Sequence, residues 1–389
     1  MARNFLYRTP GSKAAFLILL PVLAWVSDAR AQTDDVSRFE KFYRGARLRY
    51  NRVEGSFLGY RLSVGHKDRP RLTVFAESGY GFGSRAARWE AGVEYRGPEI
   101  SVNAAFFDRS DSPDPGILGA TENSLFSLLF KWDHRDYFRA KNGFEANLTL
   151  RKKRRFSFFS GLTAYHCEPM PIRAAWSLFF RNRPFRINPP ARRGDVGLLR
   201  AGVAVDTRVR SPLFRNAWYG RLRYERGLRD FAFHGLTLEG KRYQKAKFGR
   251  QGLIVRARLS TRQSTAPQFL FGLGGVGTLR GFDIREFRAN RLVLFNVEYA
   301  FRGDVLPIIP IRGFDLLNLT LFADAGWTRL MPESAHLFAG FGELNVRSFK
   351  TSTGLVIALP RQLFRLNVAR RLDRSDDAWA LSFRLRFDL

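Results

Sequence analysis

The chain has 389 residues, 45% of them hydrophobic, and a formal net charge of +30 at pH 7. Such a charge often marks a nucleic-acid-binding protein. The single cysteine, Cys167, excludes an internal disulfide. Beyond the N-terminal segment, no run approaches the ~18 consecutive apolar residues of a transmembrane helix. This leaves a soluble protein or a β-barrel, in which lipid-facing and lumen-facing residues alternate.

The N-terminus has the features of a secretory signal peptide. Basic residues precede an apolar run over 14–26, and a small-x-small cleavage site follows at 29–31. The apolar run is too short for a spanning helix of ~20 residues. We therefore expect residues 1–31 to be removed on export and residues 32–57 to form a short periplasmic segment. Because an exported chain seldom meets nucleic acid, we expect no nucleic-acid partner.

Apolar and polar residues alternate with a period of two from Tyr60 to the C-terminus. In the last segment, Leu381 and Phe383 share one face, while Ser382 and Arg384 share the other. A polar face of this kind is solvated in a soluble sandwich and lines water in a barrel. The segments repeatedly pair a charged face with an apolar face that often ends in aromatic residues. This is the pattern that the interfacial girdle of a membrane barrel requires.

The alternating segments number about sixteen, which is even, as bacterial barrels require. They lie near 58–65, 71–82, 88–97, 99–108, 143–153, 156–165, 173–182, 197–206, 217–226, 233–242, 252–261, 291–303, 317–326, 349–358, 363–371 and 378–389. We therefore predict an all-β fold, a transmembrane antiparallel β-barrel of about sixteen strands over 58–389, in the outer membrane of a Gram-negative bacterium. Its arginines would line the lumen or lie at the rims, against the phosphates of outer-membrane lipid and lipopolysaccharide. A lumen selective for anions or for acidic client segments is the alternative.

Two connections, over 109–142 and 261–290, are longer than a simple meander allows. In the first, apolar residues such as Leu125 and Leu129 recur at helical spacing, which predicts a short amphipathic helix within 121–132. A further strand there is the alternative, and it would make the strand count odd.

The loop over 261–290 carries the most specific motif of the chain. A glycine-rich stretch leads to Leu-Arg-Gly-Phe at 279–282, and Phe-Ala-Asp-Ala-Gly follows at 322–326. A phosphate-binding loop would have to open a helix, whereas strands flank these glycines. The two motifs and their spacing resemble those of the BamA/TamA superfamily, outer-membrane β-barrels that insert or secrete other proteins. The resemblance is best over the C-terminal half of the chain.

The resemblance implies that this loop is extracellular, enters the lumen and pairs Arg280 with acidic residues of the inner wall. Alternation independently places Glu298 and Asp324 on the polar faces of adjacent strands. Two such carboxylates can hold one guanidinium group in a fixed geometry. We name the expected cluster the structural lock, and it comprises Arg280, Gly281, Phe282, Glu298, Asp324 and Gly326. An ordinary arginine at the rim is the alternative.

Three further features have weaker family counterparts. Asp206 and Arg208 resemble the superfamily's Asp-x-Arg strand end, although an ordinary turn explains this turn motif equally well. Residues 49–55 resemble a subgroup of surface-antigen barrels. The chain ends in Leu389, whereas outer-membrane barrels usually end in an aromatic residue.

The sequence shows no pattern typical of an enzyme. The five histidines are scattered, and none has a defensible Ser-His-Asp or metal-ligand spacing. His134 lies between Asp133 and Asp136, and we interpret this segment as a solvated loop. We therefore expect no catalytic residue, no metal and no cofactor.

The expected function is insertion of proteins into the outer membrane or their translocation across it. The resemblance implies that a lateral seam between the first and last strands is the working part, because edge strands offer unpaired backbone groups to an incoming strand. The short segment over 32–57 leaves no room for the family's periplasmic receptor modules, the POTRA domains. We therefore expect two kinds of partner, client outer-membrane or secreted proteins and a separately encoded periplasmic receptor. A porin-like anion-selective channel and a structural barrel are the alternatives.

Overall fold

The computed structural model of the chain describes residues 45–65, 71–113, 118–153, 155–208, 216–246, 251–301, 317–359, 364–373 and 379–385. The chain divides into two compact units, residues 1–46 and 47–389, and the described residues lie almost entirely in the second. The expected signal peptide and the C-terminal Leu389 lie outside the described residues.

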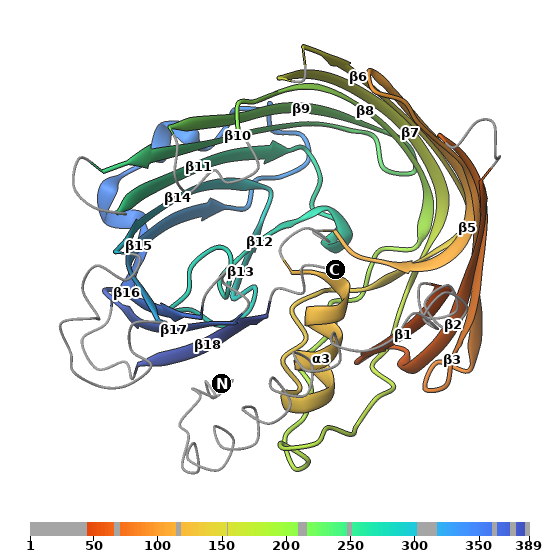
Figure 1. Ribbon diagram of the computed structural model, residues 1–389, viewed down its shortest axis with the longest axis horizontal. Helices are drawn as coiled ribbons and strands as arrows, with labels where there is room; N and C mark the ends of the chain where they lie inside the picture. The colour runs from red at the N-terminus through yellow and green to blue at the C-terminus, as the bar shows by residue number, and fades with distance from the viewer. Residues whose placement is uncertain are drawn as a thin grey trace, which may run out of the picture. The chain divides into compact units, whose positions relative to one another are not determined.

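One antiparallel sheet of sixteen strands makes up most of the second unit. Its strands are β1 (Ala46–Asn51), β2 (Gly55–Gly65), β3 (Leu72–Gly81), β4 (Ala86–Arg96), β5 (Ile100–Asp111), β6 (Phe138–Lys152), β7 (Phe156–Pro169), β8 (Gly194–Asp206), β9 (Ala217–Arg229), β10 (Phe233–Lys245), β11 (Gly252–Arg262), β14 (Arg291–Ala300), β15 (Asn318–Arg329), β16 (Lys350–Ala358), β17 (Phe364–Arg371) and β18 (Ala380–Leu385). Each strand pairs with the next in this order, and the sheet curves round an interior (Figure 1). The predicted all-β antiparallel fold and its strand number are confirmed.

The connection between β11 and β14 carries the motif and has structure of its own. It contains a short 3-10 helix, η2 (Pro267–Phe269), and a two-stranded ribbon of β12 (Phe271–Leu273) and β13 (Phe287–Ala289). The ribbon lies on the interior side of the curved sheet in Figure 1. Five strands follow this loop, as expected from the sequence.

One expected strand is wrong, and one observed strand was not expected. Residues 173–182 do not form a strand. Their backbone pairs instead with the connection between β5 and β6, where the N–H of Leu178 donates to the carbonyl of Leu128 at 2.9 Å. The unexpected strand, β1, begins at Ala46, so the sheet starts upstream of the boundary expected at residue 58. The two errors cancel, which is why the number sixteen is still correct.

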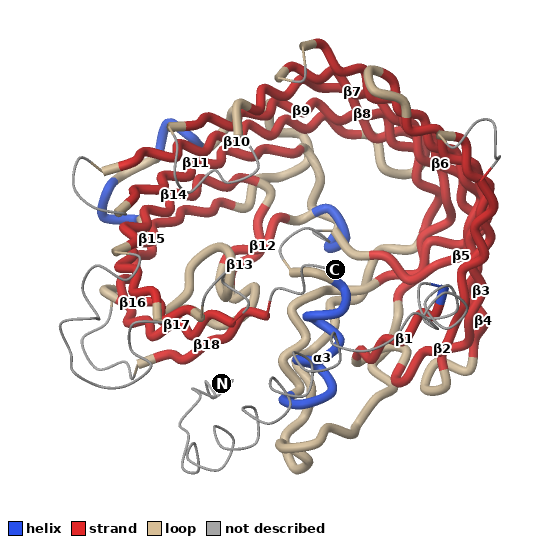
Figure 2. The backbone as a smooth tube through the Cα atoms, viewed as in Figure 1, coloured by secondary structure: helices blue, strands red, loops and turns tan. Residues whose placement is uncertain are grey.

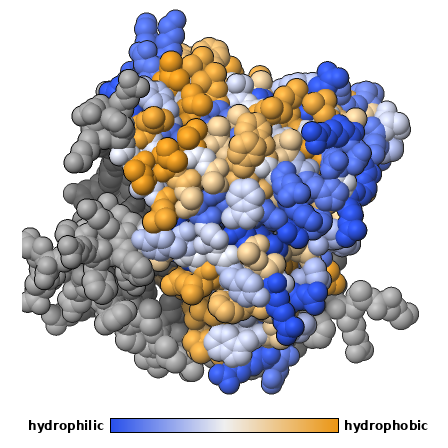
Figure 3. All heavy atoms as spheres, turned by 90° about the vertical axis from the view of Figure 1, so that its right-hand side faces the viewer, coloured by the Kyte–Doolittle hydropathy of each residue, from blue (hydrophilic) through white to orange (hydrophobic). Residues whose placement is uncertain are grey.

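Alternation along the strands separates an apolar outer face from a charged inner face. On β4, Trp89 and Val93 are each 44% exposed on the outer face. Glu90 faces the interior and pairs with Arg109 at 3.1 Å, and Arg109 also pairs with Glu145 at 2.9 Å. Figure 3 shows hydrophobic side chains gathered over part of the outer face, with hydrophilic ones along its margins. Carboxylates thus neutralise arginines on the inner wall.

A single α-helix of the described residues, α3 (Ala120–Phe130), confirms the helical prediction for 121–132. The predicted apolar face is not its most buried face, because Leu125 and Leu129 are only half-buried. The buried side chains are those of Glu122, Asn123, Phe126, Ser127 and Phe130. The helix lies between β18 and β1 in Figure 2, so it packs against the two ends of the sheet rather than on an apolar core. Among the described residues, no helix is long and apolar enough to cross a membrane.

Candidate functional site

The motif loop makes a tight glycine turn before it reaches the inner wall. Gly274, Gly275 and Gly277 have φ angles of +118°, +83° and +90°, in the region that favours glycine. A Cβ atom at Gly274 would lie 2.2 Å from the carbonyl oxygen of Asp283, so only glycine fits there. The N–H of Gly275 donates to the carbonyl of Leu279 at 2.9 Å and closes the turn.

Arg280 follows this turn and contacts two carboxylates on adjacent strands. Its Nε and Nη2 donate to Oδ2 and Oδ1 of Asp324 at 2.8 and 2.6 Å, and its Nη1 donates to Oε1 of Glu298 at 2.5 Å. The backbone N–H of Arg280 also donates to Asp324, at 3.1 Å. The side chain of Arg280 is 6% exposed and that of Asp324 is fully buried. Charge-assisted bidentate contacts in such a desolvated place fix geometry strongly.

Further side chains hold the two carboxylates in position. The β14–β15 register places Asn296 opposite Asp324, and the amide of Asn296 donates to that carboxylate at 2.8 Å. Arg365 of β17 donates to both oxygens of Glu298, at 3.2 and 3.3 Å. Glu298 therefore connects the motif loop to β17 as well as to its own strand.

The remaining lock residues lie where the loop approaches the wall closely. A Cβ atom at Gly281 would lie 2.9 Å from the Cβ atom of Ser352, and one at Gly326 would lie 2.8 Å from a leucine side chain of β12. Phe282 is buried in a cluster of loop and β14 residues, and the guanidinium carbon of Arg371 lies 4.0 Å from the centroid of its ring. The structure thus brings the six lock residues together on the inner wall formed by β14 to β17.

We expect Gly281→Ala to lower the free energy of unfolding by about 1–3 kcal/mol, as overpacking substitutions typically do. The added methyl group must displace Ser352 or the backbone of β17, since the N atom of Arg371 lies 3.2 Å from its position. Urea unfolding in detergent micelles measures this change. Gly342→Ala is the control, because its Cβ atom would meet no atom within 4 Å. Equal effects of the two substitutions would contradict the close approach at Gly281.

A second charged cluster, which we name the Asp136 hub, lies inside the barrel and was not expected. The carboxylate of Asp136 lies 3.1 Å from Arg52, 2.8 Å from Arg186, 2.8 Å from Arg285 and 3.3 Å from Arg288. These arginines come from the β1–β2 turn, the β7–β8 connection and the motif loop. One carboxylate of the β5–β6 connection therefore contacts three other connections that are far apart in the sequence.

The interpretation of residues 133–136 as a solvated loop is wrong. Asp133 and Asp136 are both buried. The carboxylate of Asp133 accepts from the backbone N–H of Arg52 at 3.1 Å and from the amide of Asn123 at 3.0 Å. The local sequence contains only polar residues and does not reveal partners that lie 81 residues away. The one feature of the sequence that could have indicated a buried partner for these carboxylates is Arg52, which lies in the segment that resembles surface-antigen barrels.

The Nδ1 of His134 lies 3.1 Å from the carbonyl oxygen of Trp132. Burial lowers the pKa of His134 to about 3, so the ring is neutral at physiological pH. A neutral ring with so low a pKa is poorly matched to acid–base work near pH 7. Among the described residues, no group of three or more His, Cys, Asp or Glu side chains is placed to hold a metal ion.

The Asp136 hub predicts a dependence of stability on pH. Burial tends to raise the pKa of Asp136, but Arg186, Arg285 and the other two guanidinium groups outweigh it and hold the pKa well below its usual value. A carboxylate with a depressed pKa adds stability above its unfolded pKa of ~3.9, and this stability is lost as pH falls through the folded pKa. We therefore expect the difference in unfolding free energy between wild type and Asp136→Asn to be largest above pH ~5 and to shrink towards pH 2.

Urea unfolding in micelles at a series of pH values measures this difference. Glu343→Gln is the control, because Glu343 forms an exposed pair with Arg329 and its removal should have a small effect at every pH. A difference for Asp136→Asn that stays constant from pH 7 to pH 2 would refute the role of the ionised carboxylate.

The turn motif forms a local ion pair at the end of β8. Nε and Nη2 of Arg208 donate to the carboxylate of Asp206 at 2.8 and 2.5 Å, and the guanidinium carbon lies 4.6 Å from the ring centroid of Tyr219. Both partners are partly exposed. This pair is compatible with the family strand end and with an ordinary turn.

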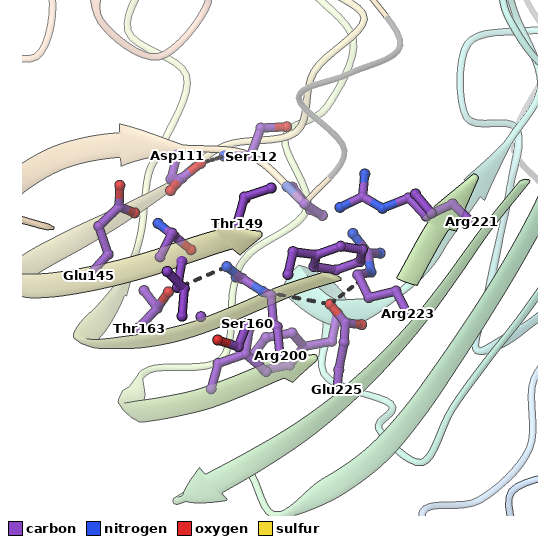
Figure 4. A pocket seen from close by; sticks show the side chains of 18 of the residues that line it. Asp111, Ser112, Glu145, Thr149, Ser160, Thr163, Arg200, Arg221, Arg223 and Glu225 are labelled. Atoms are coloured by element: carbon purple, nitrogen blue, oxygen red, sulfur yellow. Dashed lines mark hydrogen bonds and ion pairs between the residues drawn. The ribbon is translucent and has the colours of Figure 1, made fainter. Parts of the chain in front are cut away.

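A cavity of about 600 Å³ lies against the inner faces of β6 to β9. Figure 4 shows Arg200, Arg221 and Arg223 projecting into it, beside Glu225. Arg200 and Arg223 lie 3.7 and 3.5 Å from the carboxylate of Glu225. Five arginines and four carboxylates line the whole cavity, so its charge is nearly balanced. This wall does not have the large excess of cations that a strongly anion-selective pore requires.

No protein-family profile and no curated protein matches the chain. Among solved structures, BamA from Haemophilus ducreyi lacking POTRA domains 1-3 matches with a TM-score of 0.53 and 14% identity, over 86% of this chain and 68% of that one. CdiB from Acinetobacter baumannii (TM-score 0.46, 12% identity, 87% and 58% coverage) and CdiB from Escherichia coli (0.47, 12%, 88% and 61%) are also similar. The chain thus spans about three fifths of each CdiB chain. The resemblance found in the sequence is confirmed at the level of the fold, a BamA-like transmembrane β-barrel.

Proposed function

We propose that this chain is an outer-membrane barrel of a Gram-negative bacterium that inserts proteins into that membrane or moves them across it. One observation carries the proposal: the sheet has two ends, and among the described residues no strand ladder joins β1 to β18. We name the junction of these two strands the seam. An edge strand presents unpaired N–H and C=O groups, which an extended client segment can pair with by strand addition. The BamA-like fold supports the same proposal.

The structural lock would serve this function by keeping one side of the seam rigid. Arg280 ties the motif loop to β14 and β15, and the Glu298–Arg365 pair extends the tie to β17. Strand β18 pairs with β17 along its length. A firmly held β17 presents β18 as a fixed edge, which a client strand needs for correct register. The outer face would contact outer-membrane lipid and lipopolysaccharide, and the separately encoded receptor stays a prediction.

Depletion of the protein from its own cell tests this function. We expect the amount of correctly folded outer-membrane or secreted proteins to fall before growth stops, because their assembly depends on the seam. Quantitative proteomics of the outer membrane, combined with the gel mobility of unheated barrels, measures this fall, and expression of the wild-type chain should restore it. An unchanged set of folded outer-membrane proteins would contradict the proposal.

A porin-like channel is the second candidate, and the cavity in Figure 4 is the observation in its favour. Its near-balanced charge predicts weak selectivity between anions and cations. Four connections of the chain also meet in the interior at the Asp136 hub. In planar bilayers we therefore expect small, intermittent conductance. A large, steady and strongly anion-selective conductance would favour the channel over protein insertion.

A further inference from the structure

We infer that residues 120–137 are a built-in occupant of the seam, which holds both edge strands until a client strand displaces it. We name this segment the seam cap. It comprises α3 and the extended stretch that follows, up to the start of β6. The inference concerns regulation of the seam. It rests on the proposed function in one respect, namely that a client strand is what displaces the cap.

The cap takes up one backbone donor at the end of the last strand. The buried carboxylate of Glu122 accepts the backbone N–H of Leu385 at 2.7 Å, and it also pairs with the side chain of Arg384 at 3.1 Å. Next to this contact, the indole of Trp132 stacks on Phe383, with ring centroids 5.8 Å apart and planes tilted by 14°. A carboxylate therefore takes the place that the carbonyl of a neighbouring strand would have.

The cap also contacts the end of the first strand and the turn that follows it. The backbone N–H of Tyr50 donates to Oγ of Ser124 at 2.6 Å, and the backbone N–H of Arg52 donates to Asp133 at 3.1 Å. Tyr50 lies in β1, and Arg52 follows directly in the β1–β2 turn. The β7–β8 connection completes this edge, because the N–H of Arg173 donates to the carbonyl of Arg52 at 2.8 Å.

The composition of α3 fits this position between strand edges. Glu122, Asn123 and Ser127 are buried on the helix, whereas Leu125 and Leu129 are half-buried. A helix that packs on an apolar core has the opposite arrangement. Polar side chains suit this position because Tyr50 and Leu385 are buried and their backbone N–H groups need hydrogen-bond partners.

The same contacts make the cap replaceable. Side chains supply three of the bonds, from Glu122, Ser124 and Asp133, and within the described residues the cap forms no continuous ladder with either strand. An extended client segment can offer a run of backbone groups to the same edges. A client that forms a backbone ladder makes more hydrogen bonds to the edge strands than the cap does, so it can displace the cap. Until then, the cap protects the edges from pairing with the wrong partner.

The test compares hydrogen exchange of the full chain in lipid nanodiscs, without any client. We expect Glu122→Ala to speed exchange in peptides covering 380–385 by about tenfold or more, because a bond to a charged acceptor is lost. Ser124→Ala should speed exchange over 46–52, whereas Glu122→Gln should have a smaller effect than Glu122→Ala because it keeps an oxygen acceptor. Glu225→Gln is the control, since Glu225 is a buried carboxylate that pairs with Arg262 away from the seam.

Gel mobility without heating shows whether each variant is folded. Should Glu122→Ala fail to fold, Ser124→Ala and Glu122→Gln carry the test. If hydrogen exchange over 46–52 and 380–385 is unchanged in the folded Ser124→Ala and Glu122 variants, residues 120–137 do not hold the edge strands. This conclusion would stand whether or not the protein assembles clients.

A second measurement separates the cap from the proposed function. The probe is a fluorescent peptide with the sequence of residues 378–389, in which apolar and polar residues alternate. Its binding is followed by fluorescence anisotropy. We expect Glu122→Ala to bind this peptide at least several-fold more tightly than wild type and Glu225→Gln to bind it like wild type. If exchange at the edges becomes faster but no variant binds the peptide, the cap does hold the edge strands. The proposal that a client adds a strand at the seam would then be contradicted.

Discussion

Arg280→Ala is expected to lower the free energy of unfolding by about 3–5 kcal/mol, the cost of leaving a buried charge without its partner. The substitution leaves Asp324 without its cationic partner. The side chain of Asp324 is fully buried, and both of its oxygens accept hydrogen bonds from Arg280. Glu298 keeps its contact with Arg365, so the loss falls mainly on Asp324. The motif loop should also loosen from β15, because the backbone N–H of Arg280 shares that carboxylate.

Urea unfolding in micelles, the gel mobility of the unheated barrel and bilayer conductance measure these changes. Arg280→Lys should lie between wild type and Arg280→Ala, because an ammonium group keeps the charge without the planar fork that contacts two carboxylates. Arg329→Ala is the matched control, since Arg329 forms an exposed pair with Glu343 and such pairs contribute ~1 kcal/mol or less. If Arg280→Ala leaves gel mobility and conductance unchanged, the structural lock does not exist as described.

Arg52→Ala is the second substitution for which we expect a large effect, a loss of about 3–5 kcal/mol of unfolding free energy. Arg52 is fully buried and lies 3.4 Å from Asp133 and 3.1 Å from Asp136. Asp136 retains three other arginines, so the uncompensated charge is that of Asp133. We also expect faster hydrogen exchange over 131–137, because this stretch loses the guanidinium contacts of Arg52 and keeps only the bond from its backbone N–H.

The matched control for Arg52→Ala is Arg192→Ala, because Arg192 is an exposed arginine whose pair with Glu333 is 3.7 Å long. Its loss should change stability by ~1 kcal/mol or less. Similar effects of the two substitutions, or an effect of Arg52→Ala confined to the β1–β2 turn, would show that the Asp136 hub does not connect the interior segments.

The fold was largely predictable because each strand carries its own signal. Alternation over a segment such as 381–385 reports which residues face outwards, whatever the partner strand is. The strand β1 was missed because its six residues lie within 32–57, the segment interpreted as periplasmic. Residues 173–182 alternate similarly, but their hydrogen-bond partners belong to the cap region, and this choice depends on tertiary structure.

The two charged clusters differ in how far the sequence reveals them. Glu298 and Asp324 lie on strands in which the alternation of polar and apolar residues shows that their side chains face the interior. A contact with Arg280 could therefore be expected. Asp136 lies in an irregular connection, where no periodicity gives the direction of a side chain. Its contact with Arg288 joins residues 152 positions apart, which only the folded chain brings together.

The measurement that tests the central proposal most directly is site-specific photo-crosslinking to a client during assembly. A photoreactive residue replaces Leu48 on β1 or Leu381 on β18, and Leu238 on β10 serves as the control; all three are exposed on the sheet. A urea-denatured outer-membrane porin is then added to the barrel in nanodiscs. We predict crosslinks at positions 48 and 381 and none at position 238. Equal crosslinking at all three positions, or none at the seam while the porin still inserts, would contradict a function of the seam in protein insertion.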